Sequence, residues 1–261
     1  YLVEEVERIV FEKDVEMEIN IDSVGEPLSY KDIVKLVKKC KGIKNVVKVS
    51  IQTNGILLTK QKIKDLKKAG LDVVNLSISA IDDSLAKELS GTKSYNIEKI
   101  KNRARDLIKE DIQVRLCPVW IPGVNDREIE KIIEFSQEVY ASLGIQKYEV
   151  YKYSRKIKKV KPLNWWKFFN QLKKWEKKYD TKLILDKKDM EIKKAKRIEE
   201  VFKKGERVQL EVKHPGWFSN QMIAVGRNRC VSVNDCSYAV GDLINVKILE
   251  TKNNLYIGEL L

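Results

Sequence analysis

Apolar positions along residues 1–151 switch repeatedly between a period of two and a period of about 3.6, which predicts strands alternating with helices. The strands are expected at Val15–Ile21, Val46–Gln52, Val73–Ser79, Ile112–Val119 and Gln146–Tyr151. Since helical crossovers return the chain to the same end of a sheet, these strands should run parallel. The pattern therefore predicts an α/β fold, and periodicity alone leaves a partial barrel, a full barrel and an open doubly wound sheet as alternatives.

The connecting helices are expected at Leu2–Glu12, Tyr30–Cys40, from Thr59 to about Ala69, from Ser94 or Tyr95 to Lys109, and at Arg127–Tyr140. Ser29 and Thr59 are the expected N-caps of the second and third helices, because short polar side chains accept bonds from free helical N–H groups.

The pattern changes after Tyr151. A helix is expected at Asn164–Tyr179, with a core stripe of Trp165, Phe168, Phe169 and Leu172 at helical spacing. Lys182–Leu185 could form one more strand. A second, basic helix is expected from Asp189 or Met190 to Lys203.

From Gly205 onward the pattern is that of short strands separated by turns. They are expected at Val208–Val212, Met222–Val225, Cys230–Val233, Leu243–Ile248 and Leu255–Leu260. Five strands in so short a segment predict a small all-β barrel of OB-like type. The predicted domains are an α/β domain at 1–151, a basic helical extension at 152–204 and the OB-like barrel at 205–261.

The 261 residues suffice for one large and one small domain, and no apolar run is long enough to span a membrane. The four cysteines, Cys40, Cys117, Cys230 and Cys236, form no CxxC or CxxxCxxC cluster, which argues against a zinc site or a disulfide framework. Reduced cysteines and the absence of a signal peptide favour a cytoplasmic protein.

The positive charge is concentrated in one segment. Residues 152–207 hold 21 Lys and Arg against 8 Asp and Glu, a net of +13, and +13 is also the formal charge of the whole chain. Such a surplus favours binding to a polyanion, most simply a nucleic acid, and a solvated helical face is the alternative.

Polar or glycine-containing turns follow three of the predicted strands. They are Gly25-Glu26-Pro27 after the first strand, Thr53-Asn54-Gly55 after the second, and Ser77–Asp82 after the third. In parallel α/β folds, ligands bind at this carboxyl edge of the sheet. Each turn taken alone is weak, since a tight turn with a solvated side chain is the ordinary case.

Together these turns resemble motifs of the radical S-adenosylmethionine (radical SAM) family. Val24-Gly25-Glu26-Pro27 resembles its GGEP motif with valine for the first glycine, and Thr53-Asn54-Gly55 resembles its TNG turn. Ser77–Asp82 is similar to the segment that lines the ribose, and Ile121–Asp126 to the PGxND turn. The resemblance covers about Leu2 to Tyr151.

The resemblance implies a partial (β/α)6 barrel, a four-iron–four-sulfur (4Fe-4S) cluster and reductive cleavage of S-adenosylmethionine to a 5′-deoxyadenosyl radical. By position, Gly25 and Glu26 would hold the methionine ammonium. The remaining implied cofactor residues are Asn54, Ser77 and Ser79 near the carboxylate and ribose, Val119 to Gly123 near the adenine, and Arg115 opposite a carboxylate. A buried acidic group is the equal alternative as the partner of Arg115. No individual catalytic residue is implied.

One departure concerns the cluster itself. The family's CxxxCxxC motif is absent, and no residue here is predicted to bind a metal. We expect the first strand and the cluster loop upstream of Tyr1, with a degenerate, non-catalytic relative as the alternative. One thiolate such as Cys117 cannot hold a cluster alone.

Residues 205–261 resemble a TRAM domain, an OB-like barrel of RNA-modifying enzymes, through Gly205-Glu206-Arg207-Val208, Gly241–Val246 and Tyr256–Leu260. OB-type surfaces combine basic grooves with aromatic platforms. The RNA-binding candidates are Lys213, Trp217, Phe218, Arg227 and Arg229 in this segment, and Lys173 and Lys177 in the preceding helix. For Trp217 and Phe218 the alternative is that one of them fills the barrel.

Together the two resemblances imply an enzyme, a transferase or another C–H-functionalising catalyst, that modifies RNA, with tRNA as the first expectation and an electron donor as second partner. A radical SAM enzyme acting on a protein or small molecule and a non-catalytic RNA-binding relative are the alternatives.

Overall fold

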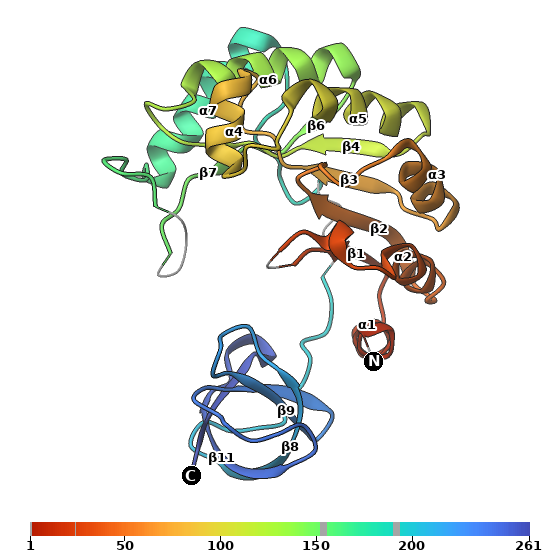
Figure 1. Cartoon of the computed structure of the whole chain (residues 1–261), viewed down its shortest axis with the longest axis vertical. Helices are drawn as coiled ribbons and strands as arrows, with labels where there is room; N and C mark the ends of the chain where they lie inside the picture. The colour runs from red at the N-terminus through yellow and green to blue at the C-terminus, as the bar shows by residue number, and fades with distance from the viewer. Residues whose placement is uncertain (1, 24, 152–155, 190–193) are drawn as a thin grey trace. The chain divides into compact units, whose positions relative to one another are not determined.

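A computed structural model of the chain describes residues 2–23, 25–151, 156–189 and 194–261, which form two compact units, Tyr1–Ala195 and Lys196–Leu261 (Figure 1). Three features of the sequence analysis lie outside the described residues: Val24 of the GEP motif, residues 152–155 and 190–193 of the basic segment, and the alternative helix start at Met190.

The first unit is built on a parallel sheet of order β1-β2-β3-β4-β6, which confirms the predicted α/β class. The strands are β1 (Met17–Ile21), β2 (Val46–Thr53), β3 (Val73–Leu76), β4 (Gln113–Leu116) and β6 (Ser142–Leu143). A short parallel pair, β5 (Val119–Trp120) and β7 (Gln146–Lys147), continues beyond them. Strands β1 to β4 are neighbours in the sheet in the order in which they occur in the sequence, and helices connect them: α2, α3, and α4 with α5.

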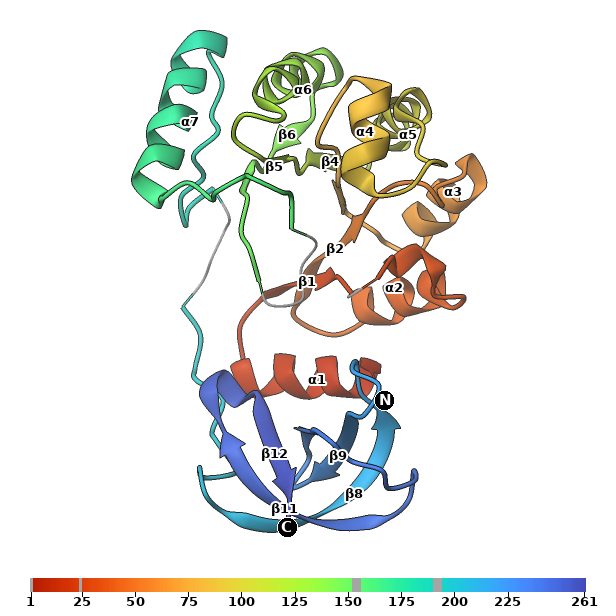
Figure 2. The ribbon, with the colours of Figure 1, turned by 60° about the vertical axis from the view of Figure 1, so that its left-hand side comes forward.

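The connecting helices lie along one side of this curved sheet (Figure 2). They are α2 (Ile33–Lys41), α3 (Lys60–Lys68), α4 (Asp83–Ser90), α5 (Ile97–Lys109) and α6 (Asp126–Val139). Helix α1 (Leu2–Lys13) precedes β1, and α7 (Trp165–Tyr179) follows β7. Thr59 caps α3 as predicted, by accepting a bond from Lys62 N. The prediction that Ser29 caps α2 is wrong: α2 begins later, with Asp32 at the N-cap, because Pro27–Ser29 forms a 3-10 turn in which the Ser29 hydroxyl donates to Glu26 O.

The two faces of the sheet differ in chemistry. Val49 and Ile51 of β2 are fully buried and belong to the apolar core shared with the helices. The alternate residue Ser50 donates to Asn20 Oδ1 (2.9 Å), and Asn75 Nδ2 reaches the same oxygen (3.2 Å). Because alternate residues share a face, the inner face is a hydrogen-bonded polar surface.

Helix α7 packs on the first unit through Phe168, Leu172 and Trp175, which are buried. The predicted core stripe is therefore wrong at two positions, since Trp165 is 57% exposed and Phe169 39%. Trp175 fixes the rotation of α7 about its axis. Its indole packs edge-on to Trp120, with ring centroids 5.0 Å apart, and its N–H donates to the Glu130 carboxylate (3.0 Å).

Two predicted elements are wrong. Residues 182–185 form no strand, and 194–201 form no helix. The backbone of the second segment bonds to barrel side chains instead: Ile198 O accepts from Asn254 Nδ2 (2.9 Å), and Val201 N donates to the Tyr256 hydroxyl (3.1 Å). Phe202 then enters the barrel core, so the second unit begins before the expected boundary at Gly205.

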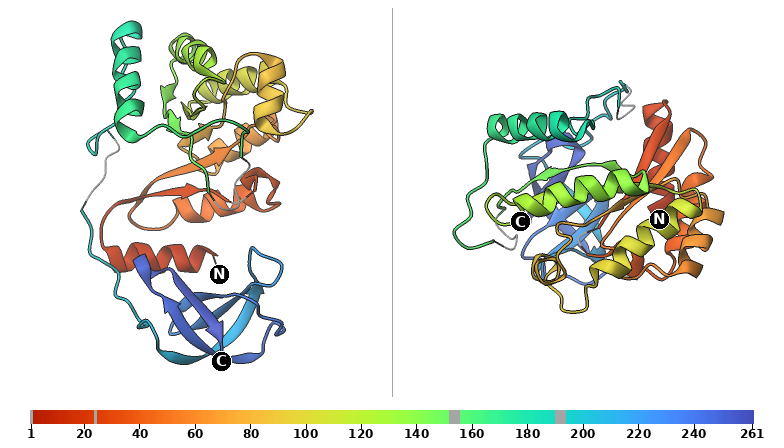
Figure 3. Two further views of the ribbon diagram at one scale, coloured as in Figure 1. Left: turned by 90° about the vertical axis from the view of Figure 1, so that its left-hand side faces the viewer. Right: turned by 90° about the horizontal axis from the view of Figure 1, so that it is seen from above.

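The second unit is a closed five-stranded barrel, seen in Figure 3. Its strands are β8 (Arg207–Pro215), β9 (Met222–Gly226), β10 (Arg229–Val233), β11 (Leu243–Glu250) and β12 (Tyr256–Leu260), in the order β10-β12-β11-β8-β9. Four pairs are antiparallel, and β10–β12 is parallel. Inward-facing residues such as Val212, Val231 and Val246 are fully buried and fill the interior.

Two buried side chains of the β5–α6 region fix the neighbouring turn after β3. Asn125 donates through Nδ2 to Ser79 O (2.8 Å) and Val119 O (2.9 Å). Glu128 Oε2 accepts from the backbone N–H groups of Ile81 (2.7 Å) and Asp82 (2.6 Å). These contacts hold the Ser79–Asp82 segment and the start of α4 against α6.

We expect Glu128→Ala to lower the free energy of unfolding by about 2 kcal/mol, since two part-buried N–H groups lose their acceptor. Burial alone would raise the pKa of Glu128, but the bonds from Lys131, Asp82 and Ile81 lower it below 4.5. Its contribution is therefore complete above pH 4.5 and disappears as the pH falls through the folded-state pKa.

Urea denaturation between pH 3 and 7 measures this difference. Glu134→Ala, an exposed glutamate of the same helix, is the control and should change stability by less than about 0.5 kcal/mol. A wild-type-minus-variant difference that stays constant down to pH 3 would contradict the assignment.

Candidate functional site

The Glu26 carboxylate joins the first two strand-end turns. Oε1 accepts from the Thr53 hydroxyl (2.6 Å) and from Leu28 N (3.1 Å), and Oε2 accepts from Asn54 N (2.9 Å). A carboxylate offers about four acceptor positions, so three protein bonds leave room for one more donor. Gly25, beside it, is exposed and has open space where a Cβ would lie.

The turn after β2 needs its glycine. Gly55 has a φ of +77°, and a Cβ there would lie 2.8 Å from Leu76 Cδ1. This close approach presents Asn54 at the strand end, where its Oδ1 accepts from Ile56 N (2.9 Å) and its amide Nδ2 remains for a ligand.

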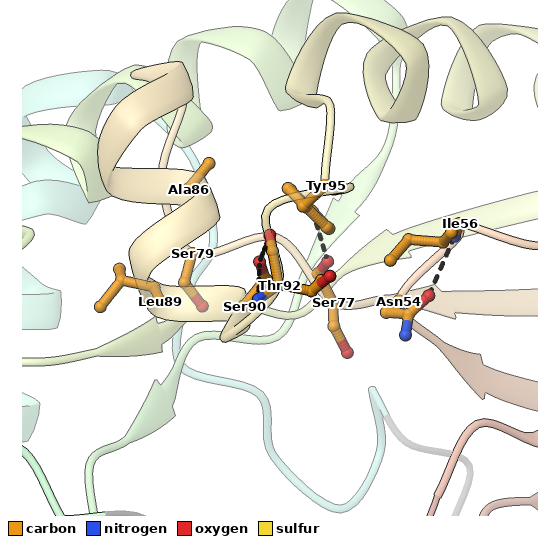
Figure 4. Close-up of a pocket in the computed structure, with 9 residues that line it drawn as sticks. All are labelled: Asn54, Ile56, Ser77, Ser79, Ala86, Leu89, Ser90, Thr92 and Tyr95. Carbon is orange, nitrogen blue, oxygen red and sulfur yellow. Dashed lines mark hydrogen bonds between the residues drawn. The ribbon is translucent and has the colours of Figure 1, made fainter.

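Asn54, Ser77 and Ser79 line one cavity of about 230 Å³, as Figure 4 shows. Ser77 Oγ accepts from Gln52 Nε2 (2.9 Å), and Ser79 Oγ accepts from Val119 N (3.2 Å). Each hydroxyl therefore keeps its own proton to donate. The structure thus brings together three of the residues predicted near the cofactor, although they come from different strand ends.

The opposite wall of this cavity comes from residues that the sequence analysis did not select. Ala86, Leu89 and Ser90 belong to α4, which was not predicted, and Thr92 and Tyr95 follow it. The Tyr95 hydroxyl donates to Ser77 O (3.2 Å), and burial raises the pKa of Tyr95, so it stays protonated. The capping signals of α4, Asp82 and Gly91, are the features that could have revealed it.

Val119 is the first residue of β5, and Gly123 lies in the turn that follows this strand. Gly123 has a φ of +77° and open space where a Cβ would lie, and its N–H donates to the Asp126 carboxylate (2.6 Å). Val119 is tied to Ser79, so this turn adjoins the cavity wall.

Arg115 lies on the polar inner face of the sheet, in register with Asn75. Its only hydrogen bond to a described residue is a long one, from Nη1 to Asn75 Oδ1 (3.5 Å), and its buried Nε has no described partner. Gly144 makes room for the side chain, because a Cβ there would lie 3.2 Å from Arg115 Cδ. A guanidinium with so few hydrogen bonds to described residues can bind an anionic group through its free N–H donors.

The described residues fit S-adenosylmethionine but not the cluster. The cavity of Figure 4 combines amide and hydroxyl groups with an apolar wall, as a nucleoside carrying an amino acid requires. No described group of three or more His, Cys, Asp or Glu side chains could hold a metal ion. Burial raises the pKa of Cys117 to about 11 despite the opposing charge of Arg115, so this thiol is protonated near neutral pH.

In the barrel, Trp217 and Phe218 stack on each other with ring centroids 6.0 Å apart and planes 15° apart. They are 66% and 43% exposed, so neither fills the barrel; Phe202 and Tyr256 lie in its core.

The basic candidates of the barrel are largely neutralised. Lys213 pairs with Glu211 (2.5 Å), and Arg227 pairs with Glu206 and donates to Val201 O (2.7 Å each). Arg229 donates to Asn228 O. Residues 205–261 contain as many acidic as basic side chains, six of each, so the surplus charge lies before this unit's strands. There, Lys173 and Lys177 are exposed on α7.

Comparison with known proteins assigns the first unit to a family. The model of the radical SAM superfamily matches residues 1–136. A Methanocaldococcus jannaschii protein named "Uncharacterized protein MJ0103" is 33% identical over 293 residues, covering 100% of this chain and 66% of that protein. A Campylobacter jejuni GTP 3′,8-cyclase is 32% identical over 119 residues, covering 46% of this chain and 36% of the cyclase. The chain thus spans two thirds or less of these relatives.

Among solved structures, Streptococcus suis SuiB superimposes with a TM-score of 0.54 and 24% identity, covering 68% of this chain and 40% of SuiB. A second SuiB structure, bound to S-adenosylmethionine, gives a TM-score of 0.53. This similarity supports the fold.

The parallel sheet, the strand-end turns and the match over residues 1–136 agree. S-adenosylmethionine and a 4Fe-4S cluster are the cofactors of the family concerned. The chain belongs to the radical SAM superfamily.

Proposed function

We propose that this chain belongs to a radical SAM enzyme that modifies RNA, and that tRNA is the substrate class to test first. The observation that carries the RNA proposal is the exposed, stacked Trp217–Phe218 pair on a closed five-stranded barrel. Stacked exposed aromatics on small β-barrels are platforms for nucleobases, because every base has a π-face.

The barrel order supports an OB-like, TRAM-type module. A meander β8-β9-β10 is closed by β11 and β12, and β10–β12 is the one parallel pair. This arrangement fits a Greek-key barrel of the OB class. Together with the net +13 of residues 152–207, it favours RNA over a neutral substrate.

For S-adenosylmethionine, we propose that Gly25 and Glu26 receive the ammonium, and that Asn54, Ser77 and Ser79 contact the carboxylate and ribose. Val119 to Gly123 would border the adenine, and Arg115 would pair with a carboxylate. In this superfamily the cofactor supplies a 5′-deoxyadenosyl radical. The residues of this chain hold S-adenosylmethionine and orient it toward the inner face of the sheet, where Arg115 and Asn75 supply polar contacts.

The group transferred is open within this proposal: methylthiolation, methylation and other C–H functionalisations all fit. A nucleoside triphosphate is the second candidate substrate. The match between the first unit and proteins named GTP 3′,8-cyclase favours it, as does the Arg115 Nε, which has no partner among the described residues.

Ser77→Ala and Asn54→Ala should each weaken S-adenosylmethionine binding about fivefold, since each removes a hydrogen bond worth about 1 kcal/mol. Isothermal titration calorimetry of the chain without the cluster measures the affinity for S-adenosylmethionine. Ser84→Ala, an exposed serine of α4, is the matched control and should leave the affinity unchanged. Unaltered affinity in both cavity variants would remove this cavity from the proposal.

The full chain should bind tRNA with an affinity whose logarithm falls linearly with the logarithm of salt concentration. Trp217→Ala should weaken binding by about 1–3 kcal/mol without changing that slope, because stacking releases no counterions. Fluorescence anisotropy from 50 to 400 mM salt tests both, with Phe11→Ala, an aromatic 83% exposed on α1, as the control. Absence of binding at the lowest salt would overturn the RNA proposal and leave the small-molecule substrate first.

A further inference from the structure

An open cleft of about 580 Å³ lies between α7 and the turn after β5. Pro122 of that turn forms one wall. The helix contributes Trp166, Lys167, Asn170, Lys173 and Lys174. Since Pro122 follows β5, the cleft opens at the carboxyl edge of the parallel strands, the edge that carries the cofactor turns.

The orientation of α7 is firmly set, so the groups on its outer face are presented in a fixed array. Phe168 and Leu172 are buried, and Glu130 receives bonds from Trp175 Nε1 (3.0 Å), Lys178 Nζ (2.7 Å) and the Tyr179 hydroxyl (3.0 Å). Trp166, Asn170, Lys173 and Lys177, at spacings of four, three and four residues, then lie along the opposite face.

The cations that line the cleft are not neutralised by described residues. Lys178, on the flank, pairs with Glu130, whereas Lys167, Lys173 and Lys174 form no ion pair within the described part of the chain. All three are exposed. This contrasts with the barrel, where Lys213 and Arg227 already have carboxylate partners.

Next to these cations is a flat apolar surface. The Trp166 side chain is 72% exposed, although burying an indole would be favourable, and it projects into the same cleft as the amide of Asn170. Ammonium groups bind phosphates, an indole stacks on a base, and an amide reads a base edge. A duplex would hide its base faces from the indole, whereas every nucleotide of a single strand offers both a phosphate and a base face.

We propose that this cleft binds a single-stranded stretch of RNA, with Trp166 stacking a base and Lys167, Lys173 and Lys174 contacting the adjoining phosphates. The proposal rests on the proposed RNA function and adds a place where the strand enters, at the edge of the sheet that carries the cofactor turns. It assigns to the first unit a binding site separate from the aromatic pair of the barrel.

The test is binding of labelled single-stranded oligonucleotides of about eight nucleotides to the full chain, followed by anisotropy. Trp166→Ala should weaken binding about tenfold. The pair Lys173→Glu with Lys174→Glu should weaken it at least about 30-fold and flatten the salt dependence, since phosphate contacts release counterions. All three side chains are exposed, so the urea midpoints of these variants should equal that of the wild type.

Two matched controls separate the cleft from general effects. Trp165→Ala removes a neighbouring tryptophan, 57% exposed, that is not part of this cleft. Lys64→Glu with Lys68→Glu changes the net charge equally on α3. Both should stay within twofold of the wild type. An oligonucleotide carrying 4-thiouracil should crosslink to the peptide that contains Trp166.

The outcomes distinguish the two proposals. If tRNA binds and Trp217→Ala weakens it while the cleft variants bind the oligonucleotide normally, the cleft inference is wrong and the RNA function stands. If neither RNA binds at 50 mM salt, both fail. If poly-glutamate displaces the oligonucleotide as effectively as unlabelled RNA of equal charge does, the cleft is a general polyanion surface and the inference is also wrong.

Discussion

The carboxyl edge of a parallel sheet has to satisfy its own backbone groups while staying open to a ligand. Here side chains from neighbouring turns meet this requirement. The Glu26 carboxylate bonds to the Thr53 hydroxyl and Asn54 N, and Glu128 bonds to Ile81 N and Asp82 N. The Glu26 bonds join the turns that follow β1 and β2, and the Glu128 bonds join helix α6 to the turn after β3. The geometry of the cavity therefore depends on a few lateral bonds between turns, more than on any single turn.

The same principle extends down the inner face of the sheet. Asn20, Ser50 and Asn75 satisfy one another, so the face can be polar without leaving these groups unpaired. Arg115 breaks this rule, because its Nε is buried without a described partner. A buried cationic donor left in this state is favourable only if something else completes it, which is why the proposals place an anionic group there.

Most strands of the first unit and part of its cavity can be predicted from the sequence, because strand periodicity and the strand-end turns are local signals. Asn54, Ser77 and Ser79 meet in one cavity as their positions implied. The bonds from Asn125 to Ser79 and from Ile81 and Asp82 to Glu128 could not be predicted, since these partners lie more than 40 residues apart in the sequence. The core stripe of α7 was misplaced for a similar reason: the anchor Glu130 that selects Trp175 over Trp165 belongs to another helix. Residues 194–201 have a helical composition, but their backbone finds partners in Asn254 and Tyr256 instead.

Phe202 packs edge-on to Tyr256 inside the barrel, at a centroid distance of 5.1 Å, although it precedes the first strand. The barrel's interior is thus completed by a residue of the connecting chain. Anyone transplanting this module onto another protein would have to carry the stretch from about Lys196 with it. A module cut at the start of β8 would lack this side chain and leave a cavity beside the Tyr256 ring, so the connector belongs to the smallest unit that can be moved intact.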